Sequence, residues 1–193
     1  CMSQTDFVGA LQKITGGALP IGELIGAAQA LTQAGQPDQA RQLYQVWIAM
    51  NASDPLVFIA HFNCSTLMQA LGDAAGAEIA LRSALAASPD FAPARINLGS
   101  ALERRGAVKD ALTEWQTGVE RLAAVTGDAV EYKITLLKQI SRVMGDNQMH
   151  EASETALIQA LDLNPDQRDV LEQYGAVRLA QCKWPIAQVT PKV

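Results

Sequence analysis

The sequence predicts an all-α fold, a solenoid in which antiparallel helix pairs are stacked in series. The first observation behind this prediction is a repeat with a period of about 34 residues, the spacing between Pro55 in "SDP" and Pro89 in "SPD". Pro165 follows "IQALDLN", which reads much like the "RSALAAS" that precedes Pro89. The second observation is that small residues recur with the same spacing. The third is that Gly marks a short turn near the middle of each unit.

The expected elements follow one another along the whole chain. Phe7, Leu11 and Ile14 have helical spacing, which favours an N-terminal capping helix followed by a linker within residues 1–20. Residues 21–167 are expected to form four repeats of two helices each, at 21–54, 58–91, 92–125 and 134–167. Extra residues at 55–57 and 126–133 interrupt the phase. Residues 168–185 are expected to form a C-terminal capping helix and a junction, followed by a tail at 186–193.

Small side chains recur where the two helices of a pair should approach closely. In the first helices of the four units these residues are Ala28, Ser65, Gly99 and Ser141, and in the second helices they are Ala40, Ala77, Ala111 and Ser153. Small residues allow two helices to pack at short distance, and larger neighbours fill the remaining space. Asp54 and Asn164, each followed by Pro, are expected to cap the helices that come next.

The segment "ARINLGSALERRGAVKDALTEWQTGVE", residues 94–120, carries a family resemblance. It places Leu98-Gly99 in a first helix and Ala111 and Trp115 in a second, a spacing that resembles the tetratricopeptide repeat. The resemblance implies a right-handed superhelical solenoid of antiparallel helix pairs with terminal capping helices. It also implies a concave face lined by the first helix of each pair, and solenoids commonly bind their partners on such a face.

Composition narrows the class of protein. A net charge of -5 and a pI near 5.0, without any cluster of Lys and Arg, argue against nucleic-acid binding. Charged or amide residues interrupt every apolar run, so no membrane span is expected, and the N-terminal stretch lacks the features of a signal peptide. Cys64 and Cys182 have no partner Cys or His at ligand spacing, which favours reduced thiols and a cytoplasmic location.

Nothing in the sequence indicates catalysis, a cofactor or a metal site. His61 and His150 are far apart, and His61 occupies a bulky packing position of its unit. The Gly-rich stretch "TGGALPIGELIG" lacks the Gly-Lys-Ser/Thr ending of a phosphate loop and is interpreted as a connector. Glu151 and Glu154 share a helix without a metal-ligand partner, and solvation is expected to account for both.

Carboxamides on the expected concave face are the candidate binding groups. Asn63 in "FNCS" and Asn97 in "INLG" lie one repeat period apart, and Gln139 occupies the same place in the last unit, whereas Gly26 does so in the first. A carboxamide both donates and accepts, so a row of them can hold a peptide backbone without reading its sequence. The alternative is that Asn63 and Asn97 satisfy neighbouring backbone groups.

Other side chains on the same helix faces extend this candidate site. Ile59, Phe62 and Ile96 would supply apolar contact to a peptide. Lys138 and Arg142, one helical turn apart, could meet an acidic group on a partner. The alternative is that these two cations merely form a solvated face.

The C-terminal stretch "YGAVRLAQCKWP" carries a second resemblance. It is similar to the junction after the tetratricopeptide repeats of bacterial SPINDLY-type O-linked N-acetylglucosamine transferases, through Arg178, Gln181, Cys182, Trp184 and Pro185. In that family the repeats present protein substrates to a catalytic domain, and an asparagine ladder grips the peptide backbone. Asn63 and Asn97 match that ladder, whereas Gly26 and Gln139 do not. The stretch itself is interpreted as a closing cap in which Cys182 is a packing residue.

The sequence therefore predicts a non-enzymatic module that binds protein or peptide. The resemblance implies that it is the substrate-recruiting region of a bacterial protein glycosyltransferase. The alternative is a free-standing scaffold or chaperone-type adaptor with no enzymatic domain, and the reading frame after Val193 would separate the two. The partner's identity and the oligomeric state stay open.

Overall fold

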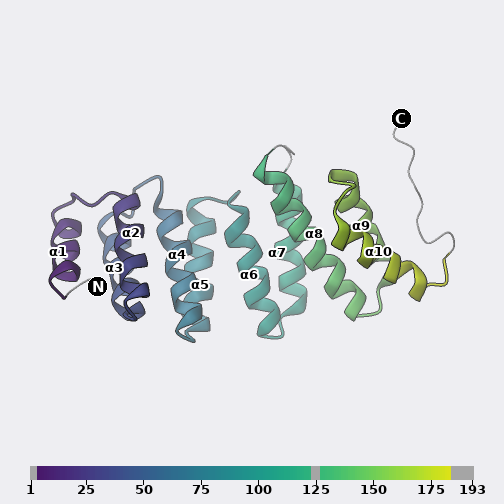
Figure 1. Ribbon diagram of the computed structural model, residues 1–193, viewed down its shortest axis with the longest axis horizontal. Helices are drawn as coiled ribbons and strands as arrows, with labels where there is room; N and C mark the ends of the chain where they lie inside the picture. The colour runs from purple at the N-terminus through teal and green to yellow at the C-terminus, as the bar shows by residue number, and fades with distance from the viewer. Residues whose placement is uncertain (1–3, 123–126, 184–193) are drawn as a thin grey trace. The chain divides into compact units, whose positions relative to one another are not determined.

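The computed structural model describes residues 4–122 and 127–183, and every regular element within them is an α-helix (Figure 1). The helices are α1 (Gln4–Thr15), α2 (Ile21–Gln33), α3 (Pro37–Met50), α4 (Val57–Ala70), α5 (Ala74–Ala87), α6 (Ala92–Arg104), α7 (Val108–Arg121), α8 (Asp128–Asp146), α9 (His150–Leu163) and α10 (Arg168–Ala180). The chain forms two compact units, Cys1–Ala101 and Leu102–Val193.

The first unit consists of helix hairpins built on one apolar core. Helices α2 and α3 pair, α4 and α5 pair, α3 contacts α4, and α1 packs against both α2 and α3. The core lies between these helices, and its large, fully buried members include Ile14, Leu24, Leu31, Leu43 and Trp47. The small residues Ala28, Ser65, Ala40 and Ala77 are buried too, as expected for positions of close helix approach.

The turn inside each of these hairpins depends on a residue with positive φ. Gly35 (φ 76°) and Gly72 (φ 82°) adopt a left-handed conformation that costs glycine little. The following N–H then reaches back to the helix it leaves, so that Gln36 donates to the Leu31 carbonyl at 2.9 Å and Asp73 to the Met68 carbonyl at 2.8 Å. These bonds satisfy carbonyls that a helix end leaves open and turn the chain into the second helix.

The connector between α1 and α2 is tied to the core by a tryptophan. Trp47 on α3 is buried, and its indole Nε1 donates a hydrogen bond of 2.8 Å to the carbonyl of Leu19. A buried indole N–H needs such a partner, and a backbone carbonyl in a connector needs a donor equally. The Gly-rich stretch "TGGALPIGELIG" is accordingly the connector that was expected, together with the start of α2.

The second unit repeats the hairpin plan from α7 to α10. Helix α8 contacts α7 and α9, and α10 packs on α9. The large side chains buried in this unit include Trp115, Leu136, Leu157 and Val170. At the place where small residues were expected, the Ser141 and Ser153 hydroxyls lie 2.9 Å apart, which shows how closely α8 and α9 approach.

Two expectations about helix starts are wrong. Asp54 and Asn164 do not cap the helices that follow. Instead, the Asp54 carboxylate accepts from the N–H of Leu56 at 2.7 Å, and the Asn164 carboxamide accepts from the N–H of Asp166 at 3.1 Å. Both side chains therefore stabilise a turn in front of the helix, as short polar residues followed by Pro commonly do.

The expectations for Glu154 and Cys182 are also wrong. Glu154 is buried, and its carboxylate accepts from Arg178 Nη1 at 2.8 Å, Gln181 Nε2 at 3.1 Å and Lys183 Nζ at 2.7 Å. This cluster, here called the Glu154 latch, fixes the end of α10 to α9. Cys182 is exposed and has φ 53°, so it is a turn residue rather than a packing residue.

Candidate functional site

A pocket of about 440 Å³ opens in the first unit between α2 and α4. Its walls come from two first helices of hairpins, with one side chain of α3 at its base. The lining residues are Ile25, Ala28, Gln29, Thr32 and Gln33 on α2, Tyr44 on α3, and Asn63, Thr66 and Leu67 on α4. The mixture of amides, hydroxyls and a few aliphatic groups suits an amphipathic ligand with many polar atoms.

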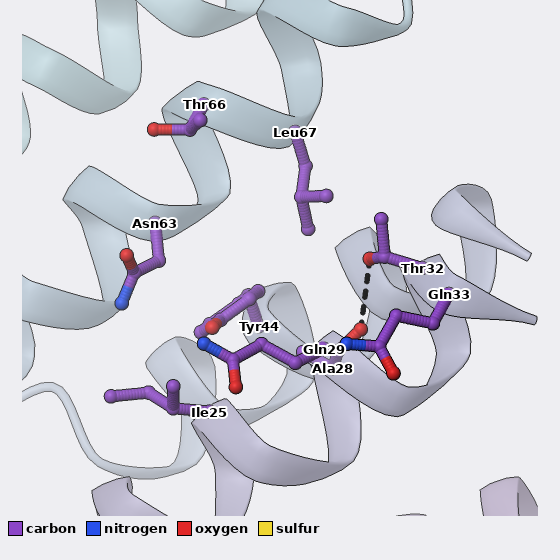
Figure 2. A pocket seen from close by; sticks show the side chains of 9 residues that line it. All are labelled: Ile25, Ala28, Gln29, Thr32, Gln33, Tyr44, Asn63, Thr66 and Leu67. Carbon is purple, nitrogen blue, oxygen red and sulfur yellow. Dashed lines mark hydrogen bonds between the residues drawn. The ribbon is translucent and has the colours of Figure 1, made fainter.

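Two carboxamides face each other across this pocket. Figure 2 shows the Asn63 side chain reaching from α4, and the Gln29 side chain from α2, into the same space beside the Tyr44 ring. Neither carboxamide forms a hydrogen bond with any described residue of the chain. Thr32 is different, because its hydroxyl donates to the Ala28 carbonyl at 2.8 Å. Asn63 and Gln29 therefore keep their donors and acceptors for solvent or a ligand.

Sequence reasoning identified Asn63 but missed Gln29, Gln33 and Thr66. The signal was available, because Gln29 lies one helical turn after Gly26, the residue that lacks a side chain at the expected place. Residues three apart on a helix share a face, so a carboxamide at either position reaches the same groove. Gln29 also stands 34 residues before Asn63, whereas Gly26 takes the matching place only when the three extra residues at 55–57 are allowed for.

Tyr44, which lines the pocket, and the neighbouring Cys64, which does not line it, both stay uncharged at neutral pH. Burial raises the pKa of Tyr44 to about 12, and the nearby Cys64 adds to the shift. Burial likewise raises the pKa of the Cys64 thiol to about 11. The Tyr44 phenol therefore remains a proton donor at neutral pH, and the pocket offers hydrogen bonds without a formal charge at its base.

The burial and the raised pKa of Cys64 predict that its thiol reacts more slowly than the exposed thiol of Cys182. At pH 8 roughly one Cys64 thiol in a thousand is ionised, and the thiolate is the nucleophile. We expect iodoacetamide to alkylate the exposed Cys182 readily and to leave Cys64 unmodified, as read by mass spectrometry of tryptic peptides. Labelling in concentrated urea serves as the control and should modify both at similar rates. Native labelling of Cys64 at the rate of Cys182 would contradict the packing of α4.

The other predicted residues of the first unit lie outside this pocket. Asn97 is half-buried on α6. Ile59 and Ile96 are half-buried as well. Phe62 packs edge-on against Phe91, with ring centroids 5.3 Å apart, so part of its apolar surface is already used within the chain.

The predicted residues of the second unit are engaged in contacts within the chain. Arg142 donates to both Glu103 oxygens, at 2.8 and 2.6 Å, and also to the Gln139 carboxamide oxygen at 3.0 Å. Lys138 pairs with Asp169 on α10. A bidentate Arg–carboxylate pair is among the stronger ionic contacts, so an acidic partner would have to compete with Glu103 for Arg142. These cations are thus more than a solvated face.

His61 is the remaining polar candidate from the sequence, and its surroundings in the fold are those of a packing residue. His61 is half-buried, and burial lowers its pKa below the ordinary value. Within residues 4–122 and 127–183, no three side chains of His, Cys, Asp or Glu gather where they could hold a metal ion. None of the helices in the same ranges combines the length and the apolar character that crossing a bilayer requires.

A second pocket, of about 710 Å³, lies in the second unit between α7, α8 and α9. Sequence reasoning did not identify it. Its walls are mostly aliphatic, with Leu137, Ile140 and Met144 from α8, and its polar groups include Gln116, Glu120 and Gln159. Unlike the first pocket, it is lined largely by the second helices of hairpins.

A sequence comparison supports the repeat assignment for part of the chain. The family model for the tetratricopeptide repeat matches residues 68–125. No curated protein sequence matches the chain. The match covers the last residues of α4 together with α5, α6 and α7.

Solved structures of tetratricopeptide repeat proteins resemble the fold across most of this chain. MamA from Desulfovibrio magneticus RS-1 is 18% identical with a TM-score of 0.59, covering 82% of this chain and 84% of that one. BtubC from P. vanneervenii is 14% identical with a TM-score of 0.70, covering 95% and 86%. YrrB, described as a repeat protein with an unusual peptide-binding site, is 14% identical with a TM-score of 0.61, covering 93% and 86%. The chain thus has the fold of tetratricopeptide repeat proteins, and the predicted all-helical class is confirmed.

Proposed function

We propose that this chain, which has the fold of tetratricopeptide repeat proteins, binds an extended segment of protein or peptide in the pocket between α2 and α4. One observation carries the proposal. The carboxamides of Gln29 and Asn63 reach into the pocket from two different helices, and neither has a partner among the described residues. A polypeptide backbone offers alternating donors and acceptors, which two carboxamides can satisfy in either direction along the chain.

The rest of the pocket complements a peptide in the same way. Ile25 and Leu67 provide aliphatic surface for ligand side chains, and Thr66 adds a hydroxyl. Tyr44 contributes a phenol that stays protonated because burial raises its pKa to about 12. Lacking charged groups, the pocket favours peptide segments by shape and backbone hydrogen bonds rather than by charge. The unusual peptide-binding site of YrrB supports this use of the fold.

A second proposal concerns the kind of protein to which this module belongs. The resemblance of residues 174–185 to a glycosyltransferase junction supports the proposal that this chain is the substrate-recruiting region of a bacterial, cytoplasmic protein glycosyltransferase. Of the residues that carry the resemblance, Trp184 and Pro185 lie outside the described residues. The alternative is a free-standing scaffold or adaptor. The fold match to BtubC, which extends over 86% of that chain, is compatible with this alternative. Sequencing the gene beyond Val193 separates the two, since a stop codon there would exclude the first.

The peptide site is tested by selecting ligands and then removing the carboxamides. Fluorescein-labelled dodecapeptides, chosen from a random library by binding to the wild-type chain, are titrated against a Gln29→Ala/Asn63→Ala double variant. Each lost hydrogen bond costs about 1 kcal/mol, so we expect the affinity to fall by roughly tenfold or more.

A matched variant distinguishes the pocket from the general surface. Gln45 is an exposed carboxamide on α3 that does not line the pocket, so Gln45→Ala should leave the affinity unchanged. Circular dichroism spectra should be the same for all variants, because Gln29 is exposed and Asn63 only half-buried. Equal affinities of the double variant and the wild type would refute the site.

A further inference from the structure

Tyr44 carries a buried hydroxyl group that has no partner in the described part of the chain. The residue is 3% exposed, and its phenol forms no hydrogen bond with another described residue. Among these residues, the fully enclosed side-chain atoms without a partner are Gln36 Oε1, Gln39 Oε1 and Arg41 Nε. The Tyr44 oxygen is not one of them, so it meets open space, and the space beside Tyr44 is the pocket between α2 and α4 (Figure 2).

An unpaired hydroxyl at the base of a pocket indicates a ligand that pairs with it. Burying a polar group without a partner lowers the stability of a fold, and Phe would fill the same space without that cost. Burial raises the pKa of Tyr44 to about 12, and the nearby Cys64 adds to the shift, so the hydroxyl keeps its proton at neutral pH. A ligand that reaches the base of the pocket is therefore expected to bring a hydrogen-bond acceptor.

The walls of the same pocket offer both donors and acceptors. The carboxamides of Gln29 and Asn63 are open, and the Gln33 side chain, which also lines the pocket, has no hydrogen bond with a described residue either. Each carboxamide has two N–H groups and an oxygen with two lone pairs, which is more than one contact with a peptide backbone uses. A group that fills the pocket can therefore donate to a carboxamide oxygen while it accepts from Tyr44.

Among the described residues, no charged side chain lines this pocket. Burial is the main cause that raises the pKa of the neighbouring Cys64, and beyond it Arg41 lowers this pKa whereas Asp73 raises it. Arg41 and Asp73 are themselves paired at 4.0 Å, so their charges largely offset each other. A charged ligand group would lose its water here without gaining a counter-ion. An aliphatic group would leave the Tyr44 hydroxyl and the carboxamides unpaired, which also disfavours binding.

We propose that the pocket selects a partner segment that inserts a Gln or Asn side chain, whose oxygen accepts from the Tyr44 hydroxyl and whose N–H groups donate to Gln29 or Asn63. A primary carboxamide is uncharged and carries a donor and an acceptor together, so it matches what the pocket presents. Ile25 and Leu67 supply the aliphatic surface that covers its methylene groups. This inference rests on the proposed function and adds a side-chain preference to it, with Tyr44 as the specificity-determining residue.

Peptide selection followed by substitution tests the inference. Dodecapeptides from a random library are selected on the wild-type chain, and those that lose affinity for the Gln29→Ala/Asn63→Ala variant are sequenced. We expect each of these peptides to contain a Gln or Asn on which its binding depends. In the tightest binder, that residue is changed to the matching acid, Glu or Asp, and to an apolar residue of similar size, Met or Leu. Each change should lower the affinity for the wild-type chain by at least about tenfold.

A Tyr44→Phe variant separates the hydroxyl from the ring that carries it. We expect it to bind the parent peptide about five- to tenfold more weakly than the wild type does, and to bind the peptide with the apolar replacement as the wild type does. Because the hydroxyl has no partner in the described part of the chain, the urea midpoint of Tyr44→Phe should equal or exceed that of the wild type. Tyr132→Phe is the matched control, since Tyr132 is exposed on α8 and lines neither pocket, and it should change neither affinity.

The outcomes distinguish this inference from the proposed function on which it rests. Peptides that depend on Gln29 and Asn63 but contain no Gln or Asn would overturn the inference and leave the proposed function intact. Equal affinities of Tyr44→Phe and the wild type for the parent peptide would do the same. An equal loss for the parent and the apolar peptide would show that the hydroxyl acts on the fold, which also overturns its role. If no selected peptide lost affinity for the double variant, the proposed function itself would fail, and the inference with it.

Discussion

Replacing Trp47 with Ala is expected to destabilise the first unit by about 3 to 5 kcal/mol, the largest effect of any single substitution there. Trp47 is 1% exposed, and its side chain fills the core between α3 and its neighbours. The substitution leaves a cavity and also removes the donor for the Leu19 carbonyl. Urea unfolding followed by circular dichroism measures the loss. Because stability in a solenoid is local, hydrogen exchange should rise in α1 to α3 before it rises in α9.

Trp47→Phe separates the two contributions of this side chain. Phe keeps most of the apolar volume but cannot donate to the Leu19 carbonyl, so we expect a cost of about 1 to 3 kcal/mol for the unpaired buried acceptor. The faster exchange should then be confined to the connector around Leu19 and to α1. Equal stabilities of the Ala variant and the wild type would show that Trp47 is not a core residue.

Replacing Glu154 with Ala is expected to release α10 from α9. The carboxylate is the shared acceptor for Arg178, Gln181 and Lys183, and Arg178 is buried with it. Removing one partner of a buried ion pair leaves a charge without compensation, which typically costs about 3 to 5 kcal/mol. We expect the α10 amides to exchange much faster while those of α8 change little. Measurement by hydrogen exchange with mass spectrometry resolves the two helices.

Two further variants test the electrostatic account of the Glu154 latch. Glu151 is exposed on the same helix, so Glu151→Ala should leave α10 protected. In a Glu154→Leu/Arg178→Leu variant no buried charge remains, and we expect it to recover much of the protection. If Glu154→Ala and Glu151→Ala gave the same exchange rates, the latch would have no role in holding α10.

The same contacts fix the direction of a pH effect. Hydrogen bonds from Lys183, Arg178 and Gln181 hold the pKa of Glu154 below its ordinary value of 4.5, against the opposing effect of burial. A lowered pKa in the folded state means that the carboxylate contributes stability at neutral pH, and that this stability is lost as the pH falls through the lowered pKa. Release of α10 in the wild type should therefore require a pH below 4.5, whereas in the Glu154→Ala variant the α10 amides should already exchange fast at neutral pH and show no further dependence on this titration.

Most of the fold could be predicted from the sequence because its determinants are local and periodic. Small residues such as Ser141 and Ser153 mark close helix approach, and the structure shows these two hydroxyls in contact. Gly35 and Gly72 mark turns that need positive φ. The position of Asn63 in the pocket agrees with the candidate site, although its function remains a proposal.

What could not be predicted depends on partners that are distant along the chain. Glu154 looks like an exposed acidic residue on a helix, yet its partners come from the end of α10. Arg142 looks available to an acidic ligand, yet Glu103 already binds both of its terminal nitrogens. A helical pattern tells which residues share a face of one helix, but not which charges a neighbouring helix brings to that face.

The sequence by itself predicted the all-helical class and the arrangement of helix hairpins in series, because helix periodicity, turn residues and small contact residues act over a few positions each. Only the tertiary structure decided which polar groups stay available to a ligand. Gln29 and Asn63 remain open in the pocket, whereas Lys138 and Arg142 are paired within the chain. The physical reason is that hydrogen bonds and ion pairs depend on distances between side chains of different helices, which packing alone sets.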